Sequence, residues 1–118
     1  MPPRDWSLRI QDMLEAIAKT QRYTAGLNYE SFVDHEMVID AVIRNIEIIG
    51  EAANHAPEEI QHRYPQLPWA EMRGIRHILI HEYFGVSLPI LWYTITHDLP
   101  SLVPLLQTIV HEEEQGAS

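Results

Sequence analysis

The stretch VIDAVIRNIEIIGEAA, residues 38–53, carries apolar side chains on more than one face of a predicted helix. A helix with so wide an apolar surface has to be covered on two sides. Ser31, followed by Asp34, is typical of a helix cap with an acid in the first turn, and we expect the helix to end near His55. The second cover comes either from another subunit, which makes the protein a homodimer, or from a bundle with this helix at its centre. The pattern leaves both interpretations open.

Two helices are predicted next to this stretch. Apolar residues at positions i, i+3, i+4 and i+7 predict an amphipathic helix over residues 5–24, which Gly26 ends. A short helix is expected over residues 57–64, with Pro57 at its first position and Pro65 after its end.

The second half of the chain predicts two more long elements. A third long helix is expected over residues 68–83, with Gly85 as its left-handed cap. Ser87 caps a fourth helix, which we expect to break or kink near Leu99-Pro100 because a proline interrupts helical hydrogen bonding. Asp98 is placed to cap the restarted helix.

These elements make an all-α fold, an up-and-down four-helix bundle with short extra helices and a kinked or split last helix. A chain of 118 residues fits one domain with a single core, over residues 1–118. The run from Glu112 to Ser118 has no large apolar side chain to anchor it, so we expect a frayed helix end and a mobile terminus there.

Composition limits the possible functions. The chain has no cysteine, which excludes disulfide frameworks, thiolate zinc sites and thiol nucleophiles and fits a reducing cytoplasm. Its start lacks an apolar signal core, and no apolar run approaches the roughly 20 residues that span a bilayer, so a soluble protein without membrane contact is expected. The formal charge of −9 argues against a long basic footprint on nucleic acid. Any contact with RNA has to be local.

The predicted helix at residues 68–83 carries the candidate functional residues. On a helical wheel, one half can face the core and the other half gathers two arginines, two histidines and a tyrosine. A solvent-exposed helix face does not require so many titratable side chains, especially in a chain with few basic residues. That half consists of Arg73, Arg76, His77, Ile80, His81, Tyr83 and Phe84.

The spacing of Arg76 and His81 sets a geometric condition. Five residues of ideal helix separate two side chains by roughly 140° around the axis and roughly 7.5 Å along it. The two meet if the arginine reaches sideways, if the helix loosens near His81, or if a two-fold axis brings in a partner's copies. A cleft at a dimer interface is the simplest solution, and it also explains the apolar excess of residues 38–53.

The sequence argues against a metal site in this segment. His77 and His81 form an i, i+4 pair able to bind zinc, but a third ligand is not evident and the His-Glu-x-x-His order is absent, so we expect no metal and no cofactor. Asn45 and Glu51 lie in the very apolar stretch, where they either orient the site or satisfy backbone and partner groups; we expect the structural role.

Arg76-His77-Ile78-Leu79-Ile80-His81 resembles the Arg-x4-6-His motif of HEPN ribonucleases, and Glu82-Tyr83 extends it to the Arg-x4-His-x-Tyr form of the HepT toxins. The similarity continues in order through residues 40–53, 67–69 and 81–85, and spans roughly Phe32 to Leu102. The short motif alone recurs by chance, but a match in order over several segments is specific. The resemblance implies a HEPN-like helical domain.

The resemblance also implies an activity: metal-independent RNA cleavage at a homodimer interface, by the toxin of a type II toxin–antitoxin system with a nucleotidyltransferase antitoxin. His81 would act as general base or acid, and Arg76 would bind the phosphate, with cleavage leaving a cyclic phosphate. His77 and Arg73 would assist. Tyr83 would be the hydroxyl to which the antitoxin attaches AMP, although packing at the bundle end explains this tyrosine equally well.

A second interpretation is a binding module. In it, a catalytically weak HEPN dimer is the nucleotide- or RNA-binding partner of a nucleotidyltransferase and does not cleave RNA. The acidic net charge favours this alternative. A purely structural helical bundle leaves the clustered half of the third helix unexplained.

Overall fold

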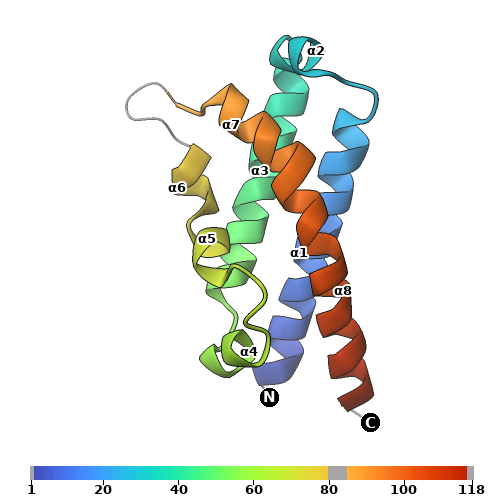
Figure 1. The fold of residues 1–118 in the computed structure, drawn as a ribbon, viewed down its shortest axis with the longest axis vertical. Coiled ribbons are helices and arrows are strands. Elements are labelled where there is room, and N and C mark those ends of the chain that lie inside the picture. Colours follow the sequence, from blue (N-terminus) through green and yellow to red (C-terminus); the bar gives the residue numbers. More distant parts are fainter. Residues whose placement is uncertain (1, 80–84, 117–118) are drawn as a thin grey trace.

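The computed structural model describes the backbone of residues 2–79 and 85–116 and the side chains of residues 6–77 and 85–116. Within these ranges the chain is the expected all-α bundle (Figure 1). Its long helices are α1 (Pro2–Thr24), α3 (Glu36–Asn54) and α8 (Leu99–Gly116). Apolar residues from all three are buried in one core cluster.

The apolar helix α3 lies at the centre. It packs against α1 on one side and against two short helices, α5 (Trp69–Arg73) and α6 (Ile75–Leu79), on the other. Its buried residues are Val42, Asn45, Ile46, Ile49, Gly50, Ala52 and Ala53. Both covers therefore come from the same chain, as the central-helix interpretation expected, and the homodimer stays a prediction.

The start of α3 differs from the expectation. Ser31 does not cap it; this residue lies inside a separate short helix, α2 (Tyr29–Val33). Asn28 caps α2 by accepting from the Ser31 amide at 2.8 Å, while the Ser31 hydroxyl accepts from the Asn28 amide at 3.0 Å. This reciprocal capping box satisfies two amides that would otherwise lack partners, which explains why the helix starts there. The end of α1 is as predicted, because Gly26 has a φ of +80° that favours glycine.

The expected long helix over residues 68–83 is broken at Gly74. With φ −98° and ψ 11°, Gly74 leaves helical geometry between α5 and α6. The two pieces approach α3 closely at another glycine: a Cβ on Gly50 would lie 3.4 Å from both the Met72 carbonyl oxygen and Ile75 Cγ2. Arg73 and Arg76 therefore belong to different helices, and one helical wheel does not relate them.

The last helical region is irregular, as expected, but it does not restart at a cap formed by Asp98. Ser87 caps α7 (Leu88–Tyr93), its hydroxyl accepting from the Ile90 amide at 3.4 Å. The π-helix η1 (Thr94–Asp98) then leads into α8 without a loop (Figure 1), so Asp98 caps no restarted helix. Because Pro100 has no N–H to donate, the wider turn before it accommodates the ring within a continuous helix.

The end of α8 is tied to the body of the protein, in contrast to the frayed end expected after His111. The carboxylate of Glu113 accepts from the Tyr64 hydroxyl at 2.6 Å and from Arg63 Nη1 at 2.7 Å. These two bonds join the last turns of α8 to the end of α4 (Glu58–Arg63), the short helix predicted after Pro57. Among the described helices, none has both the length and the apolar character of a membrane span.

Candidate functional site

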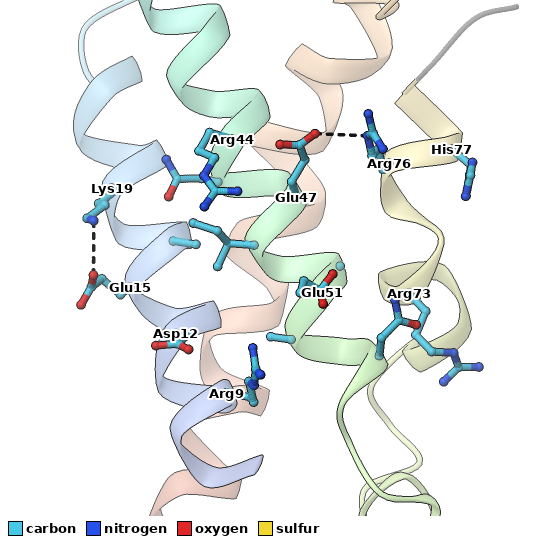
Figure 2. Close-up of a pocket in the computed structure, with 16 residues that line it drawn as sticks. Arg9, Asp12, Glu15, Lys19, Arg44, Glu47, Glu51, Arg73, Arg76 and His77 are labelled. Atoms are coloured by element: carbon cyan, nitrogen blue, oxygen red, sulfur yellow. Dashed lines mark ion pairs between the residues drawn. The ribbon is translucent and has the colours of Figure 1, made fainter. Parts of the chain in front are cut away.

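A groove of about 680 Å³ lies between α1, α3 and the α5–α6 segment (Figure 2). The chain has eight lysine and arginine residues, and five of them line this groove: Arg9, Lys19, Arg44, Arg73 and Arg76. Four carboxylates line it too: Asp12, Glu15, Glu47 and Glu51. With histidine neutral, the groove has a formal charge of +1 in a chain of −9. The basic residues of an acidic protein are thus concentrated in one place.

The candidate catalytic arginine, Arg76, reaches from α6 towards α3. Its Nε lies 3.2 Å from Oε2 of Glu47, and Figure 2 shows this ion pair bridging the two helices. The Arg76 side chain is 63% exposed and that of Glu47 is 33% exposed. Among the described residues, neither Nη atom of Arg76 has a hydrogen-bond or ion-pair partner. Within that part of the chain, the outer edge of the guanidinium is therefore available to bind a phosphate.

The two auxiliary candidates lie beside the same groove but differ in their surroundings. Arg73 donates from Nη1 to Gln61 Oε1 at 2.6 Å, which ties α5 to α4. His77 is exposed, and Figure 2 shows it on the side of α6 away from Glu47. Arg73, Arg76 and His77 thus line one groove, although only Arg76 of the three extends towards α3, and their roles stay predictions.

His81 and Tyr83 lie outside the described residues. The convergence of Arg76 with His81, the role of His81 and the modification of Tyr83 therefore stay predictions. In the described part of the chain, no group of three metal-ligating side chains is placed to hold a metal ion. The zinc-binding alternative, the pair of His77 with His81, includes a residue outside that part.

Comparison with known proteins assigns the chain to a family. The family model described as "Ribonuclease HepT-like" matches residues 13–109 of the chain, from the middle of α1 to within α8. The chain belongs to the HepT-like ribonuclease family. The match includes Arg76, His81 and Tyr83 and most of the helices that line the groove.

Several curated proteins resemble this chain over most of their length. The chain is 37% identical over 102 residues to "Putative RNase MJ1380" of Methanocaldococcus jannaschii, covering 86% of this chain and 94% of that one. It is 41% identical over 93 residues to "Probable ribonuclease HepT" of Thermococcus cleftensis, covering 79% and 84%. It is 39% identical over 89 residues to "Putative RNase TTE0752" of Caldanaerobacter subterraneus, covering 75% and 80%. No solved structure matches the chain significantly.

Glu47 and Arg44 are the site residues of this HepT-like chain that the sequence reasoning missed. Both lie on α3, where a narrow polar face stands among many apolar residues. The signal was present, because Arg44, Glu47 and Glu51 recur at spacings of three and four residues and so share one helical face. Asn45, by contrast, has the expected structural role: it is buried and donates from Nδ2 to the Ala41 carbonyl at 2.8 Å.

Proposed function

We propose that this chain is a metal-independent endoribonuclease that uses Arg76 and His81 at a homodimer interface, as the toxin of a type II toxin–antitoxin pair in the cytoplasm. The observation that carries the proposal is the placement of Arg76. Its Nε lies 3.2 Å from Glu47, and its Nη atoms have no partner among the described residues, in the groove that holds five of the chain's eight basic residues. Membership of the HepT-like ribonuclease family supports the same activity.

The proposed reaction needs only groups that the protein and the RNA supply. His81 accepts the proton of the ribose 2′-OH, and the 2′ oxygen attacks the adjacent phosphorus as the bond to the 5′ oxygen breaks. The 5′ oxygen takes up a proton, from an imidazolium or from water, and the other product carries a 2′,3′-cyclic phosphate. Arg76 donates to the non-bridging phosphate oxygens, where negative charge develops in the transition state. His77 and Arg73 orient the RNA beside this centre.

Regulation follows from the position of Tyr83, two residues after His81. We propose that a nucleotidyltransferase antitoxin attaches AMP to the Tyr83 hydroxyl. The added phosphate places a negative charge beside the catalytic groups, where it repels RNA and competes for Arg76. Co-expression with the antitoxin should then add the mass of AMP to the wild type and not to Tyr83→Phe.

A second function, a binding partner of a nucleotidyltransferase without catalysis, is favoured by one observation. Glu47 neutralises Arg76, and the whole chain is strongly acidic, so the field that attracts RNA is weak. This alternative expects a stable complex with the nucleotidyltransferase and no RNA cleavage by the isolated chain.

Controlled expression tests the proposal. Growth and the integrity of total RNA are compared for the wild type, His81→Ala and Arg76→Ala, with His111→Ala and Arg22→Ala as controls that change the same residue types at exposed positions outside the groove. Growth arrest with RNA fragments in the wild type and both controls, and in neither site variant, supports the ribonuclease. Purified protein that cleaves RNA equally well with and without EDTA supports metal independence. Folded wild type that harms neither cells nor RNA contradicts the ribonuclease and favours the binding module.

A further inference from the structure

Arg76, the described member of the proposed catalytic pair, lies at one end of the groove. Arg9 and Lys19 line it from α1, on the far side of α3 from Arg76, and Arg44 lines it from α3 (Figure 2). The proposed reaction uses none of these three cations. Their concentration opposite Arg76 requires another explanation.

Two ion pairs are formed among the described residues of the groove, one within α1 and one between α6 and α3, and neither includes Arg9 or Arg44. Lys19 Nζ lies 3.3 Å from Glu15 on the same helix, in a largely exposed i, i+4 pair. Arg9 and Arg44, in contrast, have no ion-pair or hydrogen-bond partner among the described side chains. Within the described part of the chain, their donors are thus available to a ligand with negative charge.

The spacing of these cations fits an extended polyanion. Arg9 and Lys19 are ten residues apart, which corresponds to roughly 15 Å along α1. Arg44 lies between α1 and the Glu47–Arg76 pair, so the cations cross the groove from α1 over α3 to α6 (Figure 2). A single bound phosphate could not contact this whole row, whereas successive phosphates of a nucleic acid strand could. Elsewhere the acidic surface repels such a strand.

We infer that Arg44 and Arg9 form a phosphate track that guides single-stranded RNA across α3 to Arg76. The inference rests on the proposed function, because it names where the substrate strand enters. The two arginines are positioning residues: they bind phosphates away from the scissile bond and carry no sequence preference. The four carboxylates that line the same groove repel phosphates and so limit the number of phosphates that bind. A track with three phosphate contacts, including Arg76, should give a salt slope of about −2 for single-stranded RNA.

Binding to a short 2′-O-methyl RNA oligonucleotide of mixed sequence tests the track without cleavage, because this probe lacks the attacking hydroxyl. The affinity is measured over a range of salt concentrations for the wild type, Arg44→Ala and Arg9→Ala. Arg22→Ala is the matched control: it makes the same charge change at an exposed position of α1 outside the groove. Losing one phosphate contact should reduce the salt slope by about 0.7 and weaken binding about fivefold at 0.1 M salt. Arg22→Ala should keep the wild-type slope.

The outcomes separate this inference from the proposed catalysis. Equal slopes and affinities for Arg44→Ala, Arg9→Ala and Arg22→Ala, or a wild type that does not bind the probe, overturn the track. A change of oligomeric mass in Arg44→Ala with unchanged RNA affinity also overturns it, and assigns the groove to contact between copies of the chain. If instead His81→Ala cleaves RNA like the wild type while Arg44→Ala still loses binding, the proposed catalytic pair is wrong and the track remains.

Discussion

The Nε atom of Arg76 lies 3.2 Å from Oε2 of Glu47, which joins α6 to the central helix α3. Arginine has one N–H donor at Nε and four at its Nη atoms, so this contact uses the inner edge of the guanidinium and leaves the forked outer edge. Exposed ion pairs contribute only about 0 to 1 kcal/mol to stability. The pair therefore orients Arg76 more than it stabilises the bundle.

Replacing Glu47 should separate orientation from charge. In Glu47→Ala the guanidinium loses its anchor and the groove gains positive charge, so we expect kcat to fall by roughly tenfold and KM to fall as well. Glu47→Gln keeps a polar side chain of the same size beside Nε and should retain more of the turnover than Glu47→Ala. The measurement is steady-state RNA cleavage, with urea unfolding to check that both variants stay within about 1 kcal/mol of wild-type stability. Wild-type kcat in Glu47→Ala would show that the ion pair does not position Arg76.

Gly50 sets how closely α5 and α6 approach α3. A Cβ there would meet the Met72 carbonyl oxygen and Ile75 Cγ2 at 3.4 Å, an ordinary contact, and alanine also favours helix by up to about 1 kcal/mol. Gly50→Ala should therefore be tolerated in both stability and cleavage. Gly50→Leu should cost about 1 to 3 kcal/mol, because its longer side chain pushes α5 and α6 away. Chemical unfolding of the pair checks this, and equal stability of the two variants would contradict the close packing.

Arg73 should behave as a structural residue more than Arg76 does. Its Nη1 donates to Gln61 Oε1 at 2.6 Å, so Arg73→Ala should lose about 1 kcal/mol of stability, whereas exposed Arg76→Ala should lose less. The order should reverse for cleavage, where Arg76→Ala has the larger effect. A double-mutant cycle with Gln61→Ala measures the coupling directly. Additive losses of stability in that cycle would show that the Arg73–Gln61 bond contributes nothing.

Apolar periodicity predicted the helices well where it continues without interruption, and it failed where a glycine or a capping interaction sets a helix end. The ends of α1 and α3 and the cap at Ser87 agree with the sequence analysis. The break at Gly74 was missed, because a glycine within a periodic stretch is compatible with both a continuous helix and a turn. The cap expected at Ser31 was wrong: α3 begins after His35, and Ser31 lies in α2, where Asn28 and Ser31 satisfy each other's backbone amides.

The sequence pointed to the groove residues that are close together in the chain, and it did not point to those on a different helix. The arginines and histidine of residues 73–77 could be found from one segment, because they are close in the chain. Glu47 and Arg44 belong to a different helix, and only the packing of α6 on α3 brings them to the same groove. Pairing across helices depends on how the helices pack, and one helical pattern does not specify that.

The bond between α8 and α4 predicts a pH dependence of stability. Burial opposes ionisation of Glu113, but the hydrogen bonds from Tyr64 and Arg63 and the charge of Arg63 outweigh it and lower the pKa of the carboxyl below its ordinary 4.5. Burial, together with the negative charge of Glu113, raises the pKa of the Tyr64 hydroxyl, which therefore stays a donor at neutral pH.

Since the folded-state pKa of Glu113 is lowered, its contribution is complete above pH 4.5 and is lost as the pH falls through the lower folded value. Glu113→Gln should be about 1 to 2 kcal/mol less stable than the wild type at neutral pH. The difference should shrink on acidification below pH 4.5. Urea unfolding at a series of pH values measures it, with Glu114→Gln as the control for removing an exposed neighbouring charge. If Glu113→Gln follows Glu114→Gln at every pH, the bond between α8 and α4 does not stabilise the fold.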